Sequence, residues 1–280
     1  MSPFAPIGIM AGVTLREAAR RRILWMALVA AALLLVIFAV ALRLQVLEFQ
    51  GRPMSPFVRY QVESGMLMVG LYTCDLLAVV MTILTSIDTI AGEISSGTIH
   101  AVATKPIARW QVMSGKFIGF AIMIVVYVAL TFAGTVAVAY AVTGVMPEHP
   151  LAGYALITSE CLLVLTVTFL LGSCFPTLTA GVLAIGLQGV AFMGGWLEQV
   201  SGFSQSQHIV TLGVITSLIM PSESLWRRAA YVMQTPLAAS LSFSPFANVS
   251  IPSQSALIYA AVFAGLVFAS ALWRFRARDL

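Results

Sequence analysis

The chain has very little charge. Only 9% of its 280 residues are Asp, Glu, Lys or Arg, whereas 60% are hydrophobic and the mean hydropathy is +0.96. Soluble domains typically carry about 25% charged residues, so this composition excludes an ordinary soluble domain. Uncharged runs longer than the roughly 18 residues of a spanning helix occur at Ile23–Leu42, Phe117–Pro147, Cys161–Leu197 and Ala229–Trp273. The composition predicts an all-α polytopic membrane protein.

Several signatures of chemistry are also missing. The three cysteines lie in apolar runs without a CxxC spacing, which fits small buried hydrophobic residues better than a disulfide framework. Gly115-Lys116 has Trp110 where a phosphate-binding loop needs glycine, and Phe117 where it needs Ser or Thr. The sequence therefore predicts no catalytic residue, cofactor or metal in this chain, and any use of ATP must come from a partner. The basic residues form no patch with interleaved aromatics, so no nucleic-acid partner is expected.

Proline and charge divide the chain, a single domain over 1–280, into six expected spans. Proline cannot continue a helical hydrogen-bond ladder, so Pro176 splits the longest run. The expected spans are about Ile23–Leu42, Met66–Ile90, Met113–Val142, Gly153–Phe175, Thr177–Leu197 and Ser255–Trp273. Residues 43–65 read as a polar external loop. Residues 1–22 mix apolar side chains with four arginines and predict an amphipathic elbow helix in the membrane interface.

Residues 198–254 predict an extracytoplasmic, partly helical region. The stretch His208–Met220 is too short to span and is expected to form an interfacial or re-entrant helix. A second helix is expected at Glu223–Met233, with Ser222 as its N-cap and with Trp226 and Tyr231 at the level of the lipid headgroups.

Basic residues set the expected orientation. Six spans put both termini on one side, and ten of the fifteen basic residues lie on that side: Arg16, Arg20, Arg21, Arg22, Lys105, Arg109, Lys116, Arg274, Arg276 and Arg278. Lys and Arg are enriched in cytoplasmic segments. We therefore expect cytoplasmic termini and a cytoplasmic 91–112 segment.

This polar segment between the second and third expected spans is the most informative part of the chain. We expect Glu93 near a helix N-terminus, where the helix dipole favours a carboxylate. Ile99, Val102 and Ala103 follow an i, i+3, i+4 pattern and would offer an apolar face. Pro106 is expected to begin the next helix.

The segment resembles that of ABC-2 type permeases, the membrane subunits of ATP-binding-cassette exporters. The resemblance rests on Gly92-Glu93, Gly97-Thr98, Lys105-Pro-Ile-Ala-Arg-Trp110 and Gly115-Lys116, and on the basic N-terminal segment that ends Arg20-Arg-Arg-Ile-Leu-Trp25. It implies that about Ala91–Ala103 is a coupling helix that docks on an ATPase subunit. The residues it assigns to coupling are Asp88, Gly92, Glu93, Gly97, Thr98, Ile99, Val102, Lys105, Pro106, Arg109 and Trp110.

The resemblance also implies partners. Two ATPase copies would bind ATP and Mg²⁺, a second permease copy, identical or paralogous, would complete a dimer in the lipid membrane, and an accessory extracytoplasmic protein is a further candidate. The function implied is ATP-driven export, and the location implied is a prokaryotic plasma (inner) membrane.

Three acidic residues fall within expected spans: Asp75, Glu160 and, near the cytoplasmic end of its span, Asp88. Intramembrane carboxylates are costly and mark functional sites, so Asp75 and Glu160 are candidates for a translocation path. A buried polar contact between helices is the alternative for Asp75. For the whole chain, a gradient-driven secondary transporter and an intramembrane enzyme are the alternatives; the first would show two similar halves, and the second an HExxH or a paired-aspartate site.

Overall fold

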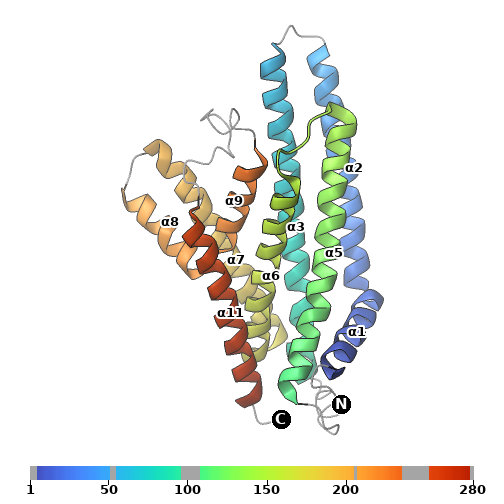
Figure 1. Ribbon diagram of the computed structural model, residues 1–280, viewed down its shortest axis with the longest axis vertical. Helices are drawn as coiled ribbons and strands as arrows, with labels where there is room; N and C mark the ends of the chain where they lie inside the picture. The colour runs from blue at the N-terminus through green and yellow to red at the C-terminus, as the bar shows by residue number, and fades with distance from the viewer. Residues whose placement is uncertain (1–4, 51–54, 96–107, 205–206, 235–251, 278–280) are drawn as a thin grey trace.

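The computed structural model describes residues 5–50, 55–95, 108–204, 207–234 and 252–277, and every element in them is a helix, which confirms the predicted fold class (Figure 1). The helices are α1 (Ala5–Arg20), α2 (Arg22–Gln50), α3 (Pro56–Ser95), α5 (Arg109–Thr143), α6 (Pro150–Cys174), α7 (Thr177–Ser204), α8 (Gln207–Ile219), α9 (Ser222–Met233) and α11 (Gln254–Ala277). Among these residues, six helices (α2, α3, α5, α6, α7 and α11) are long and apolar enough to cross a membrane.

Local sequence signals set several helix ends. The Ser55 hydroxyl accepts a hydrogen bond from the Val58 N–H (3.3 Å), and Pro56 follows as the first residue of α3. Gly144 ends α5 in the left-handed conformation (φ 75°), which glycine adopts without steric cost. The break between α6 and α7 falls at Phe175 and Pro176, as predicted.

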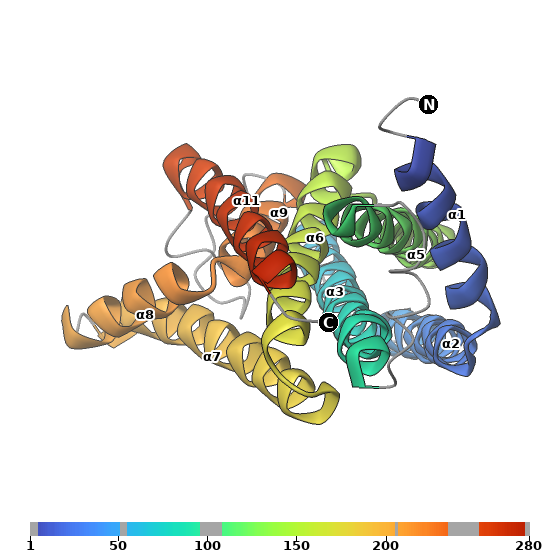
Figure 2. The same ribbon diagram turned by 90° about the horizontal axis from the view of Figure 1, so that it is seen from below.

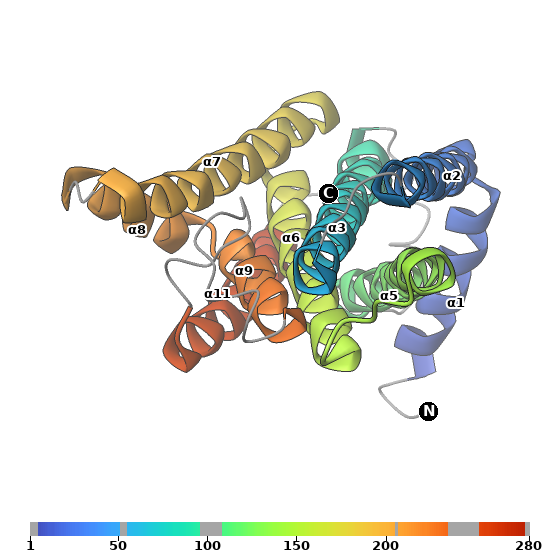
Figure 3. The same cartoon turned by 90° about the horizontal axis from the view of Figure 1, so that it is seen from above.

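α3 and α6 occupy the middle of the bundle. They are the most buried of the six long helices, whereas α2 and α11 are largely exposed, as suits helices that face lipid. α1 and the end of α11 lie at the same end of the bundle (Figure 1). Seen along the bundle, α1 lies across α5 on one side, and α7 and α8 run together on the other (Figures 2 and 3).

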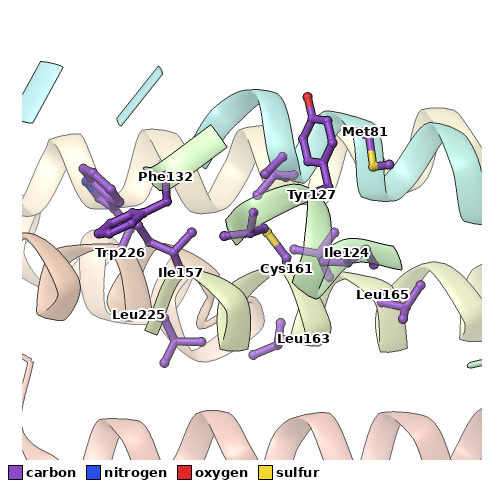
Figure 4. Close-up of a cluster of buried hydrophobic side chains, with 14 of the residues drawn as sticks. Met81, Ile124, Tyr127, Phe132, Ile157, Cys161, Leu163, Leu165, Leu225 and Trp226 are labelled. Atoms are coloured by element: carbon purple, nitrogen blue, oxygen red, sulfur yellow. The ribbon is translucent and has the colours of Figure 1, made fainter. Parts of the chain in front are cut away.

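The centre of the hydrophobic core includes side chains from α3, α5, α6 and α9. Tyr127 and Ile124 from α5 pack with Cys161 from α6 and Met81 from α3, and Trp226 from α9 joins the same cluster (Figure 4). The Cys161 thiol is fully buried there, as expected for a small hydrophobic side chain.

The predicted external loop at residues 43–65 is wrong. α2 continues to Gln50 and α3 already begins at Pro56, so helix replaces most of the expected loop. Residues 43–50 are mostly good helix formers without Gly or Pro, so nothing ends α2 at the last apolar residue. The polar residues indicate where each helix emerges from the apolar part of the membrane, but they do not indicate where the helix ends.

The end of α3 needs a similar correction. α3 runs without interruption to Ser95, so Glu93 lies in its last turn and not near a helix N-terminus. Gly92 alone does not break the helix, because a single glycine costs only about 1 kcal/mol relative to Ala.

Candidate functional site

Two groups of charged side chains define the candidate site, and the first lies where α1 meets the bundle. α1 packs across α5 at Gly115 and Gly119. A Cβ on Gly115 would lie 2.5 Å from Met10 Cβ, and one on Gly119 would lie 2.8 Å from Thr14 Cβ. The small-residue pair at an i, i+4 spacing therefore seats α1 against α5.

Arg21 ties this seated helix to α3. Its guanidinium donates to Glu17 in α1 (2.6 Å) and to Asp88 in α3 (2.8 Å). Burial opposes the charge, but the two carboxylates raise the pKa of Arg21 above its ordinary value. A Cβ on Gly92 would lie 2.6 Å from Asp88 Oδ1, so glycine at that position leaves room for the carboxylate. We call Glu17, Arg21 and Asp88 the paired cluster.

The structure locates part of the predicted coupling set. Asp88 and Gly92 lie in the last two turns of α3, and Arg109 and Trp110 begin α5, where the Arg109 guanidinium donates to the Arg276 carbonyl at the end of α11 (3.5 Å). The chain between these ends lies outside the described residues, and it contains the predicted coupling residues Gly97, Thr98, Ile99, Val102, Lys105 and Pro106.

The second group lies inside the bundle. Asp75 on α3 is 4% exposed and Glu160 on α6 is 1% exposed, and their charges interact. Asp75 Oδ1 and both carboxylate oxygens of Glu160 have no hydrogen-bond partner among the described residues. Neither side chain takes part in an ion pair in this part of the chain.

A third carboxylate, Glu223 on α9, joins them and was not predicted. The Glu148 N–H donates to the Met233 carbonyl (3.2 Å), which fixes the end of α9 beside the start of α6. At about 1.5 Å per residue, Glu223 and Glu160 lie at similar depths, roughly 15–18 Å along their helices from this bond. The charge of Glu223 accordingly acts on both Asp75 and Glu160. We call Asp75, Glu160 and Glu223 the acidic cluster.

α9 packs into the bundle, with most of its side chains buried. Trp226 is 2% exposed and packs on the Tyr72 ring (centroids 4.8 Å apart), so it faces other helices, whereas Tyr231 is partly exposed. The level of both rings relative to the lipid headgroups stays a prediction. The N-cap of α9 is Pro221 and not Ser222, whose hydroxyl donates instead to Gln188 Oε1 on α7 (3.0 Å). The reason is the tertiary packing: Trp226 contacts α3 and Ser222 contacts α7, so the Ser222 side chain does not have the capping role that the local sequence pattern predicts.

Glycines on α7 accept this insertion. A Cβ on Gly195 would overlap the Glu223 side chain, and one on Gly194 would overlap Thr216 of α8. The Gly-Gly pair thus lets α8 and α9 approach α7 closely. Two sequence features could have identified Glu223 in advance: the Gly194-Gly195 pair, and the position of the glutamate directly after Pro221-Ser222.

A cavity of about 280 Å³ opens beside the acidic cluster. It lies between α3, α7 and α9, and its polar lining is Tyr72, Asp75, Gln188 and Glu223; Leu76, Val79, Val80, Ile83, Ile185, Gly189 and Phe192 complete it. Glu160 does not line it. Of the two predicted path residues, the structure therefore places Asp75 at a cavity and Glu160 behind it.

Comparison with known protein families identifies the family of this chain. A family model described as "ABC-2 family transporter protein" matches residues 18–197, which include α2 to the main part of α7. A search of curated proteins gave no match. The chain belongs to the ABC-2 transporter family, a family of membrane permeases of ABC transporters, and the predicted resemblance is confirmed.

Proposed function

We propose that this ABC-2 family chain is the permease subunit of an ATP-driven exporter and couples to a separate ATPase through the segment between α3 and α5. The observation that carries the proposal is the polar segment that begins at Gly92-Glu93 and ends at Arg109-Trp110, in a chain of the family that is otherwise almost uncharged. Since the chain has no phosphate-binding loop, the ATPase partner would bind ATP and Mg²⁺. The positive-inside rule supports cytoplasmic termini and a cytoplasmic coupling segment.

The contacts around this segment support transmission of force. α3 leads into it and α5 leads out of it, and α1 is seated on α5 and ion-paired to α3. A push on the segment would therefore move α1, α3 and α5 together. Asp75 lies three to four turns above Asp88 on α3, so the same helix connects the coupling segment to the proposed translocation path at Asp75 and Glu160.

Assembly follows from counting docking sites. One chain offers one coupling segment, whereas ATP held between two ATPase subunits needs two. We therefore propose a permease dimer that carries two ATPase chains. Native mass spectrometry of the active complex should give two permeases and two ATPases, and an active complex with one permease would contradict the assembly.

The coupling role is tested by charge removal. At least one of Glu93→Ala and Arg109→Ala should reduce co-purification with the ATPase and transport-coupled hydrolysis. The loss should be about 2–5 kcal/mol where the charge is buried against the ATPase, whereas a charge at the rim of the interface contributes little. Glu63→Ala is the matched control, because Glu63 pairs with Arg59 near the opposite end of α3 (2.8 Å). Normal complex yield and normal coupled hydrolysis in both variants would refute the proposal.

A further inference from the structure

The cavity beside the acidic cluster is lined by two carboxylates and, within the part of the chain that the structure describes, by no Lys, Arg or His side chain. A cationic hydrogen-bond donor would complement it. Asp75 lines it, is 4% exposed, and has an oxygen without a partner among the described residues. A buried acceptor without a donor costs about 1–3 kcal/mol, and more when it is charged. Such a group persists where a ligand supplies the donor.

The surroundings add negative charge to this unmet acceptor. Glu223 also lines the cavity, and Glu160 lies close enough to act on Asp75 from behind it. Like charges brought together away from water repel more strongly than at a surface. A cation in the cavity would offset the negative charge around Asp75.

The geometry favours an organic cation over a bare metal ion. No three His, Cys, Asp or Glu side chains of the described residues are spaced to ligate one metal ion. Two aromatic side chains, Tyr72 and Phe192, line the cavity instead, and their rings lie nearly parallel with centroids 6.3 Å apart. Aromatic faces beside carboxylates attract ammonium groups through the ring quadrupole.

We propose that this cavity binds a small organic ammonium ion, with the Asp75 carboxylate as its hydrogen-bond acceptor, Glu223 as a second counter-charge, and Tyr72 and Phe192 against its apolar part. Gln188, held by Ser222, offers a neutral polar contact on the α7 side. That the bound amine is also exported rests on the function proposed above, whereas the binding itself does not.

The position of the cavity fits a ligand that arrives from outside the single chain. Its rim includes Leu76 and Val80 on α3 and Ile185 on α7, all of them exposed. A molecule therefore reaches Asp75 between α3 and α7 without any separation of the core helices.

Binding is tested on the purified full-length permease in lipid nanodiscs. Radiolabelled 2-phenylethylamine is the probe, because it carries one ammonium and one ring, and 2-phenylethanol is its uncharged counterpart. We expect saturable binding of the amine that the alcohol does not displace at equal concentration. Absence of saturable amine binding, or equal competition by the alcohol, overturns the proposal.

Two charge variants locate the site. Asp75→Asn and Glu223→Gln should each weaken amine binding by about 30-fold or more, the range found for close charge pairs at interfaces. Glu63→Gln, which removes a carboxylate near the start of α3, should leave binding unchanged. Unweakened binding in the Asp75→Asn/Glu223→Gln double variant refutes the assignment.

Two glycine substitutions on α7 test the cavity without changing its charges. Gly189 lines the cavity, and a Cβ there would meet no atom within 4 Å, so Gly189→Leu fills the space and keeps every charge. Gly186, three residues earlier on α7, also has open space but does not line the cavity. Gly189→Leu should abolish amine binding and Gly186→Leu should not; equal binding in the two variants overturns the proposal.

Measurements on the permease–ATPase complex distinguish the amine site from the proposed export function. Amine binding without stimulation of the partner ATPase keeps the site and refutes the amine as cargo. Normal ATPase coupling without amine binding keeps the permease function and refutes the site.

Discussion

The paired cluster and the acidic cluster use the same few charged residue types in opposite ways. Arg21 satisfies Glu17 and Asp88 where these side chains are 45% and 51% exposed, whereas Asp75 and Glu160 are buried without a cation among the described residues. An exposed pair contributes only about 0–1 kcal/mol, so the paired cluster serves to position α1 against α3. The acidic cluster costs stability, and a cost of this kind is typical of functional sites in membranes.

The largest test places a positive charge in the cavity beside the acidic cluster. Lysine inside a membrane helix costs about 2.5–3.5 kcal/mol on insertion scales. Leu187 packs on the core, so Leu187→Lys should be destabilised by this amount and give a lower yield of folded protein. Gln188→Lys should fold well, because Gln188 lines the same cavity as Asp75 and Glu223.

Size-exclusion yield and thermal unfolding in detergent measure the difference between the two lysine variants. Equal losses at positions 187 and 188 would show that the carboxylates do not accept a positive charge.

The second test removes the seat under the paired cluster. Gly115→Leu places a side chain where Met10 and the Ile7 carbonyl already lie, and overpacking of this kind costs about 1–3 kcal/mol. We expect a lower unfolding temperature and loss of the contact between Arg21 and Asp88, read as a loss of cross-linking between cysteines placed at those two positions. Gly186→Leu is the control, and an equal effect there would show that the close contact between α1 and Gly115 does not hold α1 in place.

The third test compares one aspartate from each cluster. Asp88→Asn should lower the free energy of unfolding by up to about 1 kcal/mol, because it breaks an exposed ion pair. Asp75→Asn should stay within about 1 kcal/mol of wild type on the stabilising side, because it removes repulsion between buried carboxylates. Thermal unfolding followed by tryptophan fluorescence measures both. A clear loss of stability in Asp75→Asn would favour a buried polar contact between helices over the proposed path.

The smallest expected effect is the response to salt. The Debye length falls from about 10 Å at 0.1 M to about 3 Å at 1 M. The stability difference between wild type and Asp88→Asn should shrink by about a few tenths of a kcal/mol over this range, because the pair is exposed. The corresponding difference for Asp75→Asn should not change, and a salt response there would mean that ions reach the cluster in the empty protein.

The middle of the chain was predictable because each long helix carries its own signal. Pro176 placed the break between α6 and α7, which falls at Phe175 and Pro176. Helix ends were less predictable: α2 and α3 extend beyond their apolar runs, since helix propensity continues where hydrophobicity stops. The acidic cluster was predicted in part, because Asp75 and Glu160 stand out as charges in apolar runs.

By itself, the amino-acid sequence determined the six long apolar helices, the polar segment between α3 and α5, and membership of a permease family, because all three are written in contiguous stretches of residues. Only the tertiary structure decided what residues 207–233 do. Glu223 lies far from Asp75 in the sequence, and in a segment whose serines, prolines and arginines indicate an external surface. α9 packs into the bundle because Gly195 leaves room for the Glu223 side chain on one side, and the Glu148 N–H binds the Met233 carbonyl at the end of α9 on the other. Contacts between distant helices, and not the local pattern, turn that glutamate into the third carboxylate of a buried site.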